Sequence, residues 1–148
     1  MYNHILLPTD GSALAREAAQ AGVKLAQVLG ARVTGFYAAP PATPVEFKGI
    51  LPVGFIDPVE HAVAIEKAAA KHLDVIPKAA ARAQVPCQVK HVTSDYPADA
   101  IIVAAKKYKC DLIFMASHGR RGVRRDSMLG TQTQRVLAES KIPVLVHR

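Results

Sequence analysis

Apolar positions along the chain fall into two patterns that alternate from one end to the other. Short continuous runs, such as "ILL" near the start and "LIFM" and "VLV" in the last third, predict strands buried on both faces. These strands are expected at residues 3–10, 31–39, 87–94, 110–117 and 142–148. Longer stretches, the first with a rough apolar face at helical spacing, predict helices at residues 13–30, 59–84, 97–109 and 127–140.

Strands that alternate with helices form a parallel sheet with helices on both faces. The pattern therefore predicts an α/β, doubly wound fold. No repeat, linker or break in composition divides the chain, so we expect a single domain over residues 1–148.

Several residues predict where these elements begin and end. Asp10 or Ser12 can cap the first helix, and Gly30 can end it. Pro77 lies inside the second helical stretch and is expected to kink or split that helix. The segment 40–58 carries five of the ten prolines and predicts an irregular surface excursion.

The composition is typical of a globular chain, with 50% hydrophobic and 21% charged residues. The opening residues contain no basic n-region and only a short apolar run, so neither a signal peptide nor a membrane span is expected. Cys87 and Cys110 form no CxxC pattern, which favours a reduced, cytoplasmic setting. We expect both cysteines to be small buried hydrophobes.

The chain is basic, with 19 Lys and Arg against 12 Asp and Glu, which suggests an anionic partner. Much of the excess is local, at Lys106, Lys107, Lys109, Arg120, Arg121, Arg124 and Arg125. Proteins that bind single-stranded nucleic acid usually place aromatic rings among such charges. Aromatic residues make up only 5% of this chain and tryptophan is absent, so nucleic acid is an unlikely partner.

Two loops carry the candidate chemistry: "PTDGS" after the first strand and "SHGRRGVRRDSMLGT" after the fourth. In an open α/β sheet, ligands bind beyond the carboxyl ends of the strands, where the strand order reverses. Gly119 and Gly122 allow close backbone approach, and Gly130 and Thr131 open a helix whose free amides can hold an anion. These features outline a phosphate site. The sequence contains no P-loop, dinucleotide fingerprint or nucleophile elbow, and its histidines have no metal-ligand spacing.

The stretches "ILLPTDGS", "CDLIFMASHGRRG", "LGTQTQRVL" and "IPVLVHR" together resemble the universal stress protein family, and the resemblance runs from end to end. It implies a five-stranded parallel sheet of order 3-2-1-4-5 and homodimers through the C-terminal strand. In one branch of the family it also implies ATP binding. That branch has Gly, two residues, Gly, nine residues, then Gly and Ser or Thr. Here Ala116 replaces the first glycine, and ten residues separate Gly119 from Gly130.

The resemblance implies an adenine-nucleotide site. Its expected members are Pro8, Thr9, Asp10, Ala38, Met115, Gly119, Arg120, Arg121, Gly130, Thr131, Gln132 and Thr133. Most have a structural alternative: Asp10 and Thr131 can be helix caps, and Ala38 and Met115 can be core residues. Arg124 and Arg125 are expected to be solvated, and His118 to have a structural role in its turn.

Three hypotheses for the function remain: a nucleotide-binding regulator, an interaction scaffold and an enzyme. The favoured one is a cytoplasmic regulatory dimer of the stress response that binds ATP, with Mg²⁺. The alternative is a nucleotide-free interaction scaffold, since some branches of the family lack the glycine motif. An enzyme of the related adenine-nucleotide α-hydrolase type is disfavoured because "PTDGS" lacks the SGGxDS loop. Asp10 is the one evident carboxylate near the site and a second metal ligand is not apparent, so at most slow ATP hydrolysis is expected.

Overall fold

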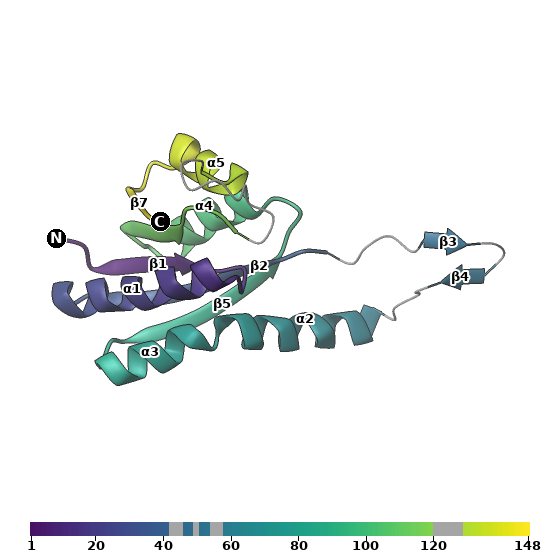
Figure 1. Ribbon diagram of the computed structural model, residues 1–148, viewed down its shortest axis with the longest axis horizontal. Helices are drawn as coiled ribbons and strands as arrows, with labels where there is room; N and C mark the ends of the chain where they lie inside the picture. The colour runs from purple at the N-terminus through teal and green to yellow at the C-terminus, as the bar shows by residue number, and fades with distance from the viewer. Residues whose placement is uncertain (42–45, 49–50, 54–57, 120–128) are drawn as a thin grey trace.

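The computed structural model describes residues 1–41, 46–48, 51–53, 58–119 and 129–148. Its main sheet has five strands, and every neighbouring pair is parallel. They are β1 (His4–Pro8), β2 (Arg32–Ala39), β5 (Cys87–Thr93), β6 (Leu112–Ala116) and β7 (Val144–His147). The spatial order is β5-β2-β1-β6-β7, with β1 in the centre (Figure 1). Counted along the chain, this is the order 3-2-1-4-5, which confirms the expected fold.

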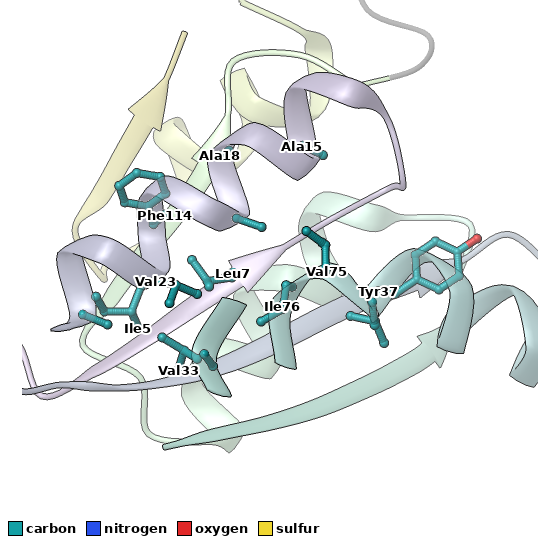
Figure 2. Close-up of a cluster of buried hydrophobic side chains, with 14 of the residues drawn as sticks. Ile5, Leu7, Ala15, Ala18, Val23, Val33, Tyr37, Val75, Ile76 and Phe114 are labelled. Atoms are coloured by element: carbon teal, nitrogen blue, oxygen red, sulfur yellow. The ribbon is translucent and has the colours of Figure 1, made fainter. Parts of the chain in front are cut away.

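Helices cover both faces of this sheet and create two separate cores. On one face lie α1 (Ala13–Leu29), α2 (Pro58–Leu73) and α3 (Val75–Ala83), and on the other lie α4 (Pro97–Lys107) and α5 (Thr131–Glu139). Neighbouring residues of a strand point to opposite faces, so Ile5 and Leu7 enter the first core and Leu6 enters the second. Figure 2 shows the first core, with Phe114 of β6 packed beside α1.

The first helix begins and ends as its sequence predicts. Ser12 is the N-cap of α1, and its Oγ accepts a hydrogen bond of 3.2 Å from the amide of Ala15. Gly30 ends the helix in the left-handed conformation, with φ of 66°. Of the two expected caps, Ser12 therefore has this role, and the Asp10 carboxylate instead accepts the amide of Ser12 at 2.9 Å.

The long second helical stretch is divided, as Pro77 predicts. α2 ends at Leu73 and α3 begins at Val75, so the break falls at Asp74. Pro77 then lies in the first turn of α3, where the amide that proline lacks would have no intrahelical acceptor.

Three expectations are corrected by the structure. The helix expected from residue 127 begins only at Thr131, because Leu129 and Gly130 are not helical. The segment 40–58 is not wholly irregular, since β3 (Glu46–Lys48) and β4 (Leu51–Val53) pair as an antiparallel hairpin.

The third correction concerns a cysteine. Cys87 is exposed because it lies on β5, at the edge of the sheet, where a strand has a neighbour on one side only. Cys110 is buried as expected, and burial raises the pKa of its thiol to about 11. Among the helices that the structure describes, none is both long and apolar enough to cross a membrane.

Candidate functional site

The candidate site lies at the carboxyl ends of β1 and β6, where the strand order reverses. From β1 the chain runs to β2 and β5 on one side, and β6 and β7 occupy the other side (Figure 1). The loops that leave two adjacent strands to opposite faces diverge at such a point and leave a crevice. The loops after β1 and β6 are the two that the sequence singled out.

Backbone hydrogen bonds fix the conformation of the loop after β1. Thr9 is buried, and its amide donates to the carbonyl of Phe36 at 2.9 Å. Its Oγ1 accepts the amide of Gly11 at 3.1 Å, and Oδ1 of Asp10 accepts the amide of Ser12 at 2.9 Å. Gly11 has a φ of +79°, a conformation that favours glycine. The Asp10 side chain is therefore held by its own loop in a fixed direction.

The loop after β6 meets this carboxylate directly. A Cβ added to Gly119 would overlap Oδ2 of Asp10 and lie 3.2 Å from its Cγ. Asp10 and Gly119 are thus in contact across the crevice, although 108 residues separate them in the sequence. Glycine at 119 is required for this approach, because any side chain there displaces the carboxylate.

The start of α5 forms the third wall of the site. The amide of Gly130 donates to the carbonyl of Ser117 at 2.8 Å, and a Cβ on Gly130 would lie 3.0 Å from Cα of His118. Gly130 is the N-cap, and glycine has no side chain with which to cap α5. The first intrahelical amide bond is that of Gln134, so the preceding amides have no acceptor within the helix. Such amides, with the helix dipole behind them, are suited to an anion.

Two of the expected site residues at this helix form side-chain hydrogen bonds within the protein. The Thr133 hydroxyl is buried and donates to the carbonyl of Ala116 at 2.9 Å, which fastens α5 to the end of β6. The Gln132 side-chain oxygen accepts the amide of Ala98 at 3.0 Å and satisfies the first turn of α4. Thr131 is exposed at the first position of α5, and its side chain stands at the crevice end of the helix.

The remaining residues of the expected nucleotide site differ in how far their side chains are buried. Pro8 and Met115 are buried at the ends of their strands, and Ala38 is half-buried against the core under α4 and α5. His118 is half-buried, with Nδ1 at 3.2 Å from Oγ of Ser117, which fits a structural role in the turn. The arginines of the loop, Arg120, Arg121, Arg124 and Arg125, and Gly122 with them, lie outside the described residues.

Sequence reasoning did not single out Gly11 or His72, which lie in and against the loop after β1. The signal for Gly11 was available, because Asp-Gly is a typical turn pair in which glycine takes a positive φ. No comparable local signal marks His72 on α2, whose ring contacts Gly11 from a distant part of the chain. In the part of the chain that the structure describes, no three His, Cys, Asp or Glu side chains gather to hold a metal ion.

Known proteins of one family resemble this chain along its whole length. The sequence model of the "Universal stress protein family" matches residues 1–148. The "Universal stress protein in QAH/OAS sulfhydrylase 3'region" of Thermus aquaticus is 34% identical over 152 residues, covering 100% of both chains. The "Universal stress protein MJ0531" of Methanocaldococcus jannaschii is 30% identical over 146 residues, covering 99% of this chain and 82% of that protein.

Solved structures share the fold at lower identity. A universal stress protein family member from Burkholderia pseudomallei has a TM-score of 0.72 and 22% identity, covering 99% of this chain and 96% of that one. The Archaeoglobus fulgidus universal stress protein in complex with dAMP has a TM-score of 0.66 and 15% identity, covering 99% and 98%. An Arabidopsis thaliana family protein with AMP bound has a TM-score of 0.63 and 14% identity, covering 97% and 90%.

Proposed function

The chain belongs to the universal stress protein family, and from this premise we propose that it binds an adenine nucleotide between β1 and β6. ATP, with Mg²⁺, is the nucleotide we favour. Binding would serve a regulatory role in the stress response, with no dedicated catalysis. Structural neighbours of the same fold bind dAMP and AMP, which supports an adenine nucleotide as the ligand class.

The contact between Asp10 and Gly119 is the observation that carries this proposal. The Asp10 carboxylate meets the backbone of Gly119 where the strand order reverses. The loop that carries Gly119 leads to the start of α5, whose first amides have no acceptor within the helix. A carboxylate suits the hydroxyl groups of a ribose, whereas the amides of Thr131 and its neighbours suit phosphate oxygens. The site would thus offer one group for each of the two ends of a nucleotide.

Alanine in place of the first glycine of the motif is compatible with a nucleotide site here. Ala116 ends β6 and is not among the residues with positive φ, so the backbone there does not require glycine. Its carbonyl accepts the hydroxyl of Thr133, which holds α5 in place behind the crevice. The second departure is the extra residue between Gly119 and Gly130, in the connection from β6 to α5, and lengthening a connection by one residue costs little stability.

Calorimetry of Mg-ATP and AMP with the wild-type protein and with Gly130→Val tests the proposal. The added side chain starts 3.0 Å from the backbone of His118 and extends into the approach to the free amides, so binding should be abolished. Ala138→Val is the matched control, since it adds a similar side chain to an exposed position near the end of α5. Circular dichroism checks that both variants keep the fold.

Two results would contradict the proposal. A wild-type protein that gives no heat and no protection at millimolar ATP would show that the longer loop no longer forms a phosphate site. Gly130→Val that binds as tightly as the wild-type protein would place the nucleotide elsewhere. In the first case, the nucleotide-free interaction scaffold becomes the better description.

The same family membership supports a second proposal, a two-fold homodimer through β7. This strand lies at the edge of the sheet, and Leu145 on it is 39% exposed, while Val144 and Val146 are half-buried. An edge strand with apolar side chains and unpaired backbone groups is suited to pairing with a second strand.

A further inference from the structure

We propose that His72 is a positioning residue that holds the loop after β1, and with it the Asp10 carboxylate, in the orientation for nucleotide binding. This inference rests on the proposed function, because it assigns a role within the same site. It concerns a residue on α2, a helix that contributes none of the expected binding residues.

The His72 ring fills the space that a side chain at position 11 would occupy. A Cβ added to Gly11 would overlap Nδ1 of His72 and lie 2.5 Å from Cε1 and 2.7 Å from Cγ of its ring. Gly11 therefore has two separate reasons to be glycine: its φ of +79° and the ring packed against it. The second reason exists only because of His72.

The ring also contacts the sheet. The centroids of the Tyr37 and His72 rings lie 5.0 Å apart, with planes inclined at 57°, a favourable tilted arrangement. Tyr37 is a buried residue of β2 in the core shown in Figure 2. Ala69 and Leu73 of α2 are also buried in that core, so the helix cannot move away freely. His72 thus joins the rigid sheet to the loop.

The contact between His72 and Gly11 affects the site because Gly11 directly follows Asp10 in the chain. Gly11 follows Asp10, and its amide is bonded to Thr9, while the carboxylate of Asp10 is bonded to the amide of Ser12. A shift of Gly11 therefore moves both Asp10, which precedes it, and Ser12, whose amide holds the Asp10 carboxylate. Both movements change the position of that carboxylate. Because Oδ2 of Asp10 contacts Gly119, that shift also changes the distance between the loops after β1 and β6. Removing the ring leaves a void under the loop, which frees it to sample other conformations.

The first test compares nucleotide affinity in variants of position 72. His72→Ala should weaken Mg-ATP binding roughly tenfold, the lower end of what the loss of a supporting contact costs a bound ligand. His72→Phe keeps a ring of similar size and should bind close to the wild-type level, which a general loss of stability would not explain. His91→Ala, at an exposed position of the edge strand β5, is the control and should have no effect.

A double-mutant cycle tests whether positions 11 and 72 act through each other. Gly11→Ala should lose affinity because its Cβ meets the ring and because φ is positive. With His72→Ala in the same chain, the clash is gone and part of the affinity should return. Gly30→Ala measures the cost of a positive φ alone, since Gly30 has a φ of +66° and no atom within 4 Å of an added Cβ. It should lower stability without changing the affinity.

Amide NMR spectra of the ligand-free protein give a readout that needs no nucleotide. His72→Ala should shift the amides of Ser12 and Gly119, and His72→Phe should shift them less. If the wild-type protein binds no nucleotide, the proposed function fails while these spectra still decide the positioning role. Unchanged amides at both positions in a folded His72→Ala, or losses that simply multiply in the double mutant, would overturn the inference. Should His72→Ala not fold, His72→Gln and the Gly11 variant supply the same comparison.

Discussion

At the scale of single residues, His4 couples the stability of the fold to pH. The His4 side chain is buried, and its Nε2 lies 2.6 Å from Oγ1 of Thr34. Burial, and then the nearby charge of Arg32, lower the pKa of His4 below its usual value of 6.5. The unfolded chain therefore binds a proton that the folded protein resists. The contribution of His4 to stability should be fully present above pH 6.5 and be lost as the pH decreases through that value toward the folded pKa.

Urea unfolding at about pH 7.5 and about pH 5.5 measures this effect. The wild-type protein should lose more stability between the two conditions than His4→Gln, whose side chain can still reach Thr34 but does not titrate in this range. His91→Gln, on the exposed β5, is the control and should follow the wild-type protein. Equal losses in the wild-type protein and His4→Gln would show that other groups cause the pH dependence.

At the scale of elements, the start of α1 depends on one hydroxyl. Oγ of Ser12 accepts the amide of Ala15, one of the first-turn amides without an acceptor in the helix. Ser12→Ala should therefore lower the free energy of unfolding by about 1 kcal/mol. Ser12→Asp keeps an oxygen that can cap the helix and should retain most of the stability. Denaturant midpoints of the three proteins decide the matter, and equal stability of wild-type protein and Ser12→Ala would contradict the capping role.

At the scale of the whole molecule, the proposed dimer depends on the edge strand β7. Val144→Lys combined with Val146→Lys places two charges on this strand, where they oppose strand pairing. Light scattering should then show a monomer with circular dichroism unchanged. Val103→Lys is the control, because Val103 is 62% exposed on α4, away from β7, and its replacement should leave the dimer intact. A dimer that persists in the double variant would place the interface elsewhere.

Much of this architecture follows from the sequence because the signals involved are local. Runs such as "LIFM" indicate burial on both sides, which a parallel sheet covered by helices provides. Pro77 cannot sit deep in a helix, and Gly30 takes a left-handed conformation without strain, so each indicates a boundary within a few residues. The strand order is implied by the resemblance to a family, whereas the two loops of the site are indicated by the α/β pattern and the general position of ligands in such sheets.

Tertiary structure alone decided which groups meet and which side chains are covered. Cys87 lies in a strand that mixes apolar and polar residues, and it is exposed because that strand occupies an edge. The hydrogen bond from the Thr133 hydroxyl to the carbonyl of Ala116 likewise joins two separate elements, α5 and β6. The contacts of Asp10 with Gly119 and of Gly11 with His72 join residues far apart in the chain. A periodic pattern reports on neighbours along one element, whereas such contacts depend on how separate elements pack, and that packing has no local signature in the sequence.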